Sequence, residues 1–125
     1  MIFELQAKVV VCERVERRLS FADHPSKHDH YFIVQRDDES PNEALPDLEN
    51  IYIERDDQFW GGYGGIDRVI LERQGLTLHL TPKMASRLGG YEKLHVTFTL
   101  DDVRFKELKD VLLLIMVGYE DRLQV

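Results

Sequence analysis

Three histidines lie close together in the polar run from Asp23 to His30. Imidazole nitrogens are common ligands of transition metals, so His24, His28 and His30 are the first candidates for chemistry in this chain. Their spacing matches no established metal motif, and Lys27 would repel a bound cation. We therefore interpret the segment as a polar surface loop and predict neither a metal site nor a cofactor.

Four glycines follow Trp60, at positions 61, 62, 64 and 65, and form the second candidate. Glycine-rich loops can bind phosphate because their backbone amides converge on the anion. No Gly-Lys-Ser/Thr triplet follows here, and the spacing is not that of a dinucleotide-binding fingerprint. The cluster is typical of a turn with positive φ angles that joins two strands.

Nucleophiles are present without the partners that would activate them. Cys12 is the single cysteine, so the chain forms no intrachain disulfide, and no base or orienting group for it can be identified. No serine lies in a Gly-x-Ser-x-Gly context, and adjacent acids such as Asp56-Asp57 usually indicate solvent exposure. We predict that the protein is not an enzyme.

Acidic residues concentrate in one part of the chain. Residues 37–57 hold nine acids and a single base, Arg55, for a net charge of −8, whereas the whole chain carries −7. A solvated loop is one interpretation of such a run. The other is an electrostatic face for a basic partner, because complementary charge accelerates association.

The bulk composition excludes several classes of partner. The chain has 125 residues, 43% hydrophobic and 31% charged, which predicts one domain over residues 1–125. An acidic chain lacks the excess of cations that general nucleic-acid binding and docking on an anionic membrane require. The N-terminus has no uninterrupted apolar stretch typical of a signal peptide, and the longest apolar run, residues 111–117, is too short to span a bilayer. We expect a cytoplasmic protein.

Hydrophobic periodicity indicates the elements that must position these residues. Alternation predicts strands at residues 3–11, 31–36, 51–55, 68–73, 76–81 and 94–100, with an extended piece near 18–21. The strand at 31–36 is apolar on both faces at its start. A short helix is predicted over 82–88 and a long one from Asp102 to Met116 or Tyr119, capped by its acidic start. This order predicts an α+β fold: a mostly antiparallel sheet of about six strands, with the C-terminal amphipathic helix packed on one face.

The final turns of the long helix are apolar nearly all round. Leu113, Leu114 and Val117 lie opposite the stripe that begins at Phe105 and ends at Tyr119. We expect this second face to be covered by a loop, by another strand or by a second subunit, the last giving a homodimer through the helix.

The stretch from Tyr52 to Leu114 resembles a known family. An aromatic-glycine run from Tyr52-Ile53-Glu54 into Gly64-Gly65-Ile66 precedes a short hairpin, a strand LHVTFTLDD and a closing amphipathic helix. This arrangement resembles the immunity protein ten family of bacterial polymorphic toxin systems. The resemblance implies a non-catalytic antidote that binds a cognate toxin domain, often an enzyme that attacks nucleic acid.

Such a toxin presents cations to bind phosphate, so the expected mechanism is an acidic surface that covers its active-site cleft. The family motif fixes no contact residues. Charge and expected exposure select the candidates, with the three aromatic residues as anchors. The predicted toxin-binding residues are Asp37, Asp38, Glu39, Glu43, Asp56, Asp57, Phe59, Trp60 and Tyr63.

Three alternatives stay open at this point. Trp60 and Phe59 could fill the core rather than contact a partner. The chain could be a small dimeric ligand-binding or regulatory domain with no toxin partner. A metal-dependent enzyme built on the histidine segment is the third.

Overall fold

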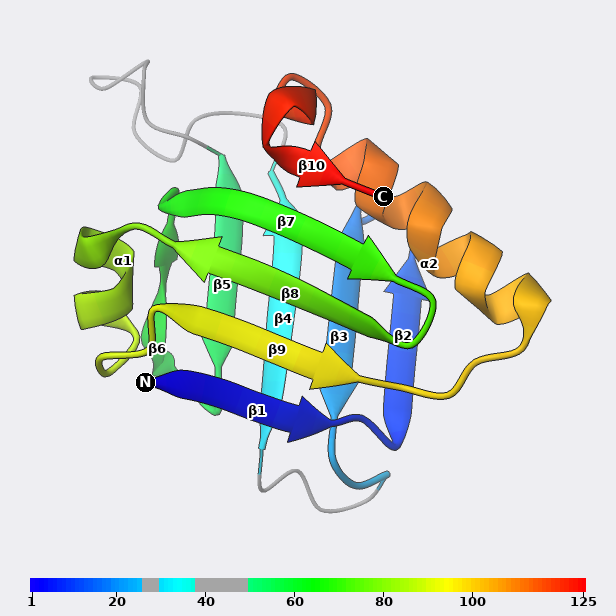
Figure 1. Ribbon diagram of the computed structural model, residues 1–125, viewed down its shortest axis with the longest axis horizontal. Helices are drawn as coiled ribbons and strands as arrows, with labels where there is room; N and C mark the ends of the chain where they lie inside the picture. The colour runs from blue at the N-terminus through cyan, green and yellow to red at the C-terminus, as the bar shows by residue number, and fades with distance from the viewer. Residues whose placement is uncertain (26–29, 38–49) are drawn as a thin grey trace.

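Two five-stranded sheets pack face to face in the computed structural model, which describes residues 1–25, 30–37 and 50–125 (Figure 1). Their strands cross at a steep angle, as in orthogonal sheet packing. The buried side chains of both inner faces form one hydrophobic core.

The first sheet, sheet A, has the strand order β1-β9-β8-β7-β10. Its three central strands are antiparallel, whereas the edge strands β1 and β10 pair in parallel with β9 and β7. The strands are β1 (Ile2–Gln6), β7 (Ile66–Glu72), β8 (Gly75–Leu80), β9 (Lys93–Thr97) and β10 (Leu123–Gln124).

The second sheet, sheet B, is an antiparallel meander in the order β2-β3-β4-β5-β6. A bulge between Glu54 and Arg55 interrupts the pairing of β5 with β6. The strands are β2 (Val9–Glu13), β3 (Arg18–Ala22), β4 (Tyr31–Arg36), β5 (Ile51–Arg55) and β6 (Asp57–Tyr63).

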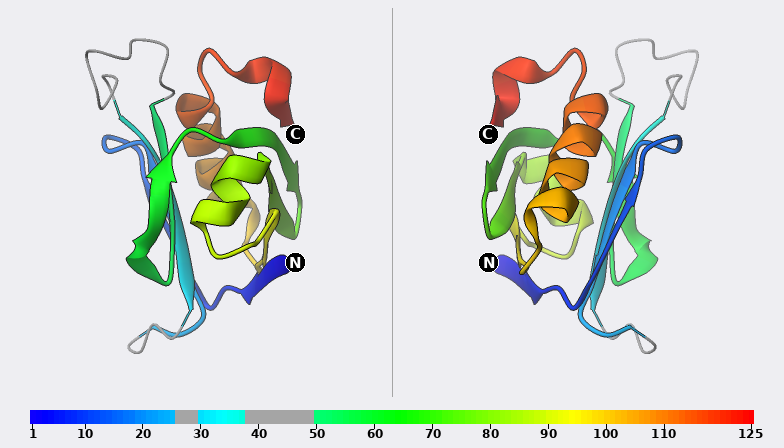
Figure 2. Two further views of the ribbon diagram at one scale, coloured as in Figure 1. Left: turned by 90° about the vertical axis from the view of Figure 1, so that its left-hand side faces the viewer. Right: turned by 90° about the vertical axis from the view of Figure 1, so that its right-hand side faces the viewer.

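Two α-helices lie on the inner side of sheet B (Figure 2). Helix α1 (Pro82–Arg87) contacts β6 and β8, and the Thr81 hydroxyl accepts a hydrogen bond from the Met84 amide at its start. Helix α2 (Asp102–Ile115) contacts β2, β3 and β4, and Asp101 caps it as predicted. A short 3₁₀ helix, η1 (Glu120–Arg122), leads into β10. No helix in the described part of the chain is long and apolar enough to cross a bilayer.

The α+β class is confirmed, but the sheet differs from the prediction. The described residues form ten strands in two sheets rather than about six in one. The extended piece near residues 18–21 is strand β3, and it lies inside sheet B between β2 and β4. Two sheets bury each other's inner faces, so most of the apolar surface is covered by strands and α2 completes the core at one end.

The predicted strand at residues 3–11 is divided between the sheets. The chain leaves sheet A after Gln6 and enters sheet B at Val9. Phe3 and Leu5 point into the core, but Val10 is the buried residue in β2 and Val11 is 40% exposed. The apolar stripe of odd-numbered residues therefore passes from the inner face of sheet A to the outer face of sheet B.

Helix α2 matches the predicted stripe and leaves its second face partly open. Leu108, Leu112 and Ile115 are fully buried, whereas Leu113 is 42% and Val117 is 51% exposed. A homodimer through this helix stays a prediction.

Candidate protein-binding face

The outer face of sheet B is not covered by any other element of the described chain, since sheet A and both α-helices lie on its inner side (Figure 2). Strand register places its outward side chains in three cross-strand rows. The apolar row is Val9, Ala22 and Tyr31. The middle row is Val11, Ser20, Ile33, Glu54 and Gly61. The polar row is Glu13, Arg18, Gln35, Tyr52 and Tyr63.

One half of this face is an apolar groove. A cavity of about 300 Å³ is lined by Val9, Val11, Ala22, Tyr31 and Ile33, among others. The outward positions of β8 and β9 in sheet A are different in kind: they hold Thr77, His79, Lys93, His95 and Thr97. The outer face of these two strands is thus polar, whereas sheet B presents aliphatic side chains that no described element covers.

A buried carboxylate marks the boundary between the apolar and polar halves. Glu54 is 7% exposed, and both of its oxygens accept hydrogen bonds from tyrosine hydroxyls. Tyr31 Oη lies 2.6 Å from Oε2, and Tyr52 Oη lies 2.7 Å from Oε1. Burial, and then the hydrogen bond to Glu54, raises the pKa of both tyrosines far above its ordinary value. Both phenols therefore stay protonated and serve as donors.

A second tyrosine-carboxylate pair lies at the other side of the polar row. Tyr63 Oη donates to Asp37 Oδ2 at 2.5 Å, and Gln35 Nε2 donates to Asp37 Oδ1 at 3.3 Å. The hydrogen bond to Asp37, together with burial, raises the pKa of Tyr63 to about 12. The rings of Tyr52 and Tyr63 are 5.1 Å apart between centroids. These contacts bring two of the predicted residues, Asp37 and Tyr63, together on the face.

An acidic cavity of about 550 Å³ opens between these pairs. Among the described residues its charged lining is Glu13, Asp37, Glu54 and Arg18, which together carry two net negative charges. Arg18 forms two hydrogen bonds to Glu13, of which Nε to Oε1 measures 3.1 Å. The cavity shares Ser20 and Ile33 with the apolar groove, so the two are continuous.

Glycines in and after β6 shape this face. A Cβ on Gly61 would lie 2.5 Å from Tyr52 Oη, so a side chain there would displace the hydroxyl from Glu54. Beyond β6, Gly64 and Gly65 have φ angles of 77° and 79° and turn the chain into β7. The predicted turn with positive φ is thus confirmed for Gly64 and Gly65, whereas Gly61 and Gly62 lie within strand β6 and not in the turn.

A protein-family model described as immunity protein 10 matches residues 8–106. The chain belongs to the immunity protein 10 family. The matched residues contain all of sheet B, and with it the three rows of the outer face. Comparison with curated proteins gives no match.

In this immunity protein 10 chain, the other predicted contact residues have different environments. Asp56 has a φ of 62°, accepts from the Tyr31 amide at 3.0 Å and pairs with Arg55 at 3.2 Å. It therefore anchors the β5–β6 connection from within. Asp57 is exposed and accepts from the Phe59 amide at 2.9 Å. The predicted residues Asp38, Glu39 and Glu43 lie outside the described residues.

The aromatic pair before the glycines divides between core and surface. Phe59 is 77% exposed, whereas Trp60 is half-buried and packs against the core. The Arg55 guanidinium lies 4.5 Å from the Trp60 ring, lies 4.9 Å from the Tyr91 ring and donates to the Leu88 carbonyl at 2.9 Å. Trp60 thus forms part of the packing around a buried arginine, and Phe59 is the more accessible aromatic residue of the two.

The histidine segment is described only in part. His30 Nδ1 lies 3.3 Å from Asp56 Oδ2, and His28 lies outside the described residues. Within the residues that the structure describes, no three His, Cys, Asp or Glu side chains gather as metal ligands would.

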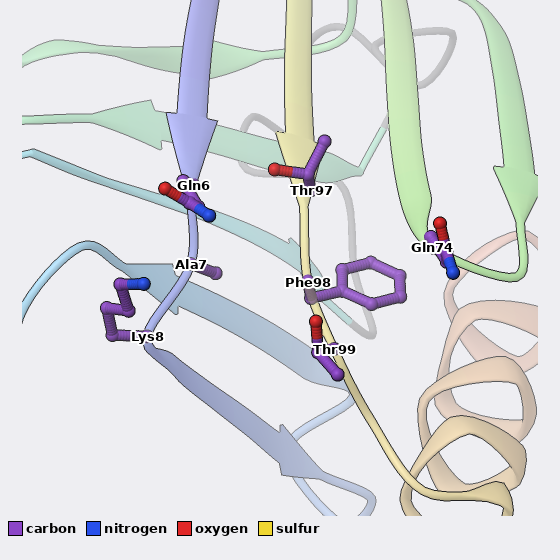
Figure 3. A pocket seen from close by; sticks show the side chains of 7 residues that line it. All are labelled: Gln6, Ala7, Lys8, Gln74, Thr97, Phe98 and Thr99. Carbon is purple, nitrogen blue, oxygen red and sulfur yellow. The ribbon is translucent and has the colours of Figure 1, made fainter.

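A further cavity, of about 370 Å³, lies where the chain passes from sheet A to sheet B (Figure 3). Its lining includes Gln6, Lys8, Gln74 and Thr99, and Lys8 is the one charged side chain among the described residues there. The Ala7 amide at this corner donates to the Thr97 carbonyl at 2.8 Å. The corner joins the two sheets, and its described lining contains no side chain of opposite charge to Lys8 and no nucleophilic thiol.

Sequence reasoning missed most of the outer face of this immunity protein. Val9, Val11, Ile33 and Glu54 are not among the predicted contacts, although the strand at 31–36 begins with apolar residues on both faces. Apolar residues on both faces of this strand are the sequence signal that could have indicated the outer face. A strand whose two faces are both apolar has a second surface to bury.

Proposed function

We propose that this immunity protein neutralises a cognate toxin domain by binding it through the outer face of sheet B, without catalysis. The observation that supports this is the combination, on one uncovered sheet face, of the apolar groove and three tyrosines. Interface cores are enriched in tyrosine and depleted of charge. The charge that is present lies at one side, in the acidic cavity.

The charge balance favours a basic partner. The chain carries −7, and Asp37 at the edge of the outer face begins the acidic run of residues 37–57. A toxin that acts on nucleic acid must present cations to phosphate. We infer that the immunity protein covers such a cleft, with its acidic cavity over the cations.

The β5–β6 connection borders this face and extends it. Gln58 lines the acidic cavity, and the exposed residues Asp57 and Phe59 flank it in the sequence. Phe59 is exposed and packs edge-to-face on Trp60 at 4.9 Å. We propose Phe59 as an aromatic anchor and Asp57 as a rim charge.

Co-expression with the toxin domain encoded beside the gene tests the proposal. The native protein should restore growth and co-purify with the toxin. Val11→Glu, which puts a charge into the apolar groove, should abolish both. Thr97→Glu, on the polar outer face of sheet A, is the matched control and should protect fully.

Thermal unfolding of both variants checks that each one folds. If folded Val11→Glu binds the toxin with an unchanged Kd, sheet B is not the binding face. If the native protein neither binds nor protects, the antidote proposal is wrong for that pair.

A further inference from the structure

The acidic cavity has two carboxylates that no described cation neutralises. Among the described residues, Arg18 donates side-chain hydrogen bonds to Glu13 and, at 3.4 Å, to Gln35. Glu54 and Asp37 instead accept hydrogen bonds from neutral hydroxyl and amide groups. Their negative charges therefore remain in a partly desolvated cavity, where electrostatic attraction to a cation is stronger than it would be in water.

Both carboxylates also have acceptor positions that no described donor uses. An ionised carboxylate offers about four acceptor positions. Glu54 receives one hydroxyl on each oxygen, and Asp37 receives one hydroxyl and one amide. The donors fix the orientation of each carboxylate and leave further lone pairs for an incoming ligand, which is the arrangement of a preorganised site.

We propose that the acidic cavity binds an arginine side chain of the toxin, with an aliphatic neighbour of that arginine seated in the apolar groove. The inference rests on the proposed function and deepens it. A guanidinium fits better than an ammonium because its planar fork serves two acceptors and its face stacks on tyrosine rings. The rings of Tyr52 and Tyr63, whose centroids are 5.1 Å apart, line the cavity beside Glu54 and Asp37.

The spacing of the two halves limits the shape of the partner. Adjacent rows of the outer face are two residues apart along each strand, or about 6.6 Å, so the apolar and polar rows are about 13 Å apart. A partner segment must place its aliphatic and cationic side chains within this distance. Neighbouring turns of a helix or alternate residues of a strand both satisfy that condition.

A small probe tests the cavity by itself. We expect Nα-acetyl-arginine amide to shift the backbone amide signals of Gln35, Gly61 and Tyr63 in ¹⁵N-labelled protein in a saturable way. The citrulline analogue has the same shape without the charge and should leave them in place. Equal shifts with both compounds, or none with arginine, would overturn the inference.

Toxin binding tests the same cavity in the complex. The double variant Asp37→Asn, Glu54→Gln keeps the shape and removes both charges, and we expect its Kd for the toxin to rise at least about tenfold, with a weaker dependence on salt. The control is Glu4→Gln, Glu72→Gln, which removes two charges from exposed positions of sheet A. Asp37→Asn alone serves if the double variant fails to fold.

The outcomes separate the two proposals. If the double variant binds the toxin as tightly as the native protein, the arginine site is wrong although the antidote function stands. If the native protein binds no toxin, the proposed function fails, and the probe titration still decides whether the cavity takes arginine.

Discussion

Gly65 is where the turn after β6 meets helix α1, and its replacement by alanine should be costly for two separable reasons. Its φ angle is +79°, a conformation that costs an L-residue about 1–2 kcal/mol. A Cβ there would also lie 2.4 Å from Met84 Cβ. Met84 is buried, and its Cβ is fixed to the helix backbone, so relief requires α1 to move. Overpacking of this kind costs about 1–3 kcal/mol, for a total of about 2–5 kcal/mol.

Two other glycines separate these contributions. Gly118 has a φ of +89°, and no atom lies within 4 Å of the place that a Cβ would take, so Gly118→Ala carries the conformational cost alone. Gly61 has no positive φ, but its Cβ would lie 2.5 Å from the Tyr52 hydroxyl and 3.2 Å from the Ile53 carbonyl oxygen. The hydroxyl can move away by giving up its hydrogen bond to the buried Glu54 carboxylate, so Gly61→Ala should cost about 1–3 kcal/mol.

Urea denaturation followed by circular dichroism measures the free energy of unfolding of the three variants and the native protein. We expect Gly65→Ala to lose about 1–3 kcal/mol more than Gly118→Ala, with the same m-value. If the two losses agree within about 0.5 kcal/mol, α1 does not pack on the turn as described, and the reasoning is refuted.

Two further predictions concern buried polar groups. Arg55→Met should destabilise the protein by about 2–4 kcal/mol and shift Trp60 emission to the red, because the buried guanidinium and its contact with the Trp60 ring are lost. The control, Arg73→Met, changes a half-exposed site and should cost less than about 1 kcal/mol in the same urea titration. Between pH 10 and about 12 folded Tyr63 keeps a proton that the unfolded chain loses, so the free energy of unfolding should fall through this interval. Tyr63→Phe should reduce that fall. An unchanged pH profile of the variant would contradict the raised pKa of Tyr63.

Elements with a strong local signal could be predicted from the sequence. Helix α2 begins at its predicted cap, Asp101, and ends within a turn of the predicted limit, because capping and a helical stripe act over neighbouring residues. Strand β5 and the turn at Gly64-Gly65 likewise lie where alternation and glycine spacing place them. In each case the deciding interactions are local.

The division of the first strand could not be predicted in the same way. Apolar residues recur at every odd position from Phe3 to Val11, and the one departure from alternation, Val10, does not by itself show that the buried face changes at Ala7-Lys8. The change is made by strand pairing, of β1 with β9 over long range and of β2 with β3 in a hairpin. A one-residue change of register moves a whole strand's side chains to the other face, so this error alone concealed the outward position of Val11.

Counting charges along the chain predicts an acidic surface for a partner but not how such a surface is built. Residues 37–57 carry −8, yet within that run Asp56 is paired with Arg55 and serves the β5–β6 connection. Glu54, one position before Arg55, points to the opposite face of the sheet and has hydroxyl partners instead of a cation. Acids two positions apart therefore differ: the charge of Asp56 is balanced within the fold by Arg55, whereas that of Glu54 has no cation among its described partners. For an acidic immunity protein, the useful quantity is the number of carboxylates on one face that lack an internal cation, and among the described residues the acidic cavity has two, Asp37 and Glu54.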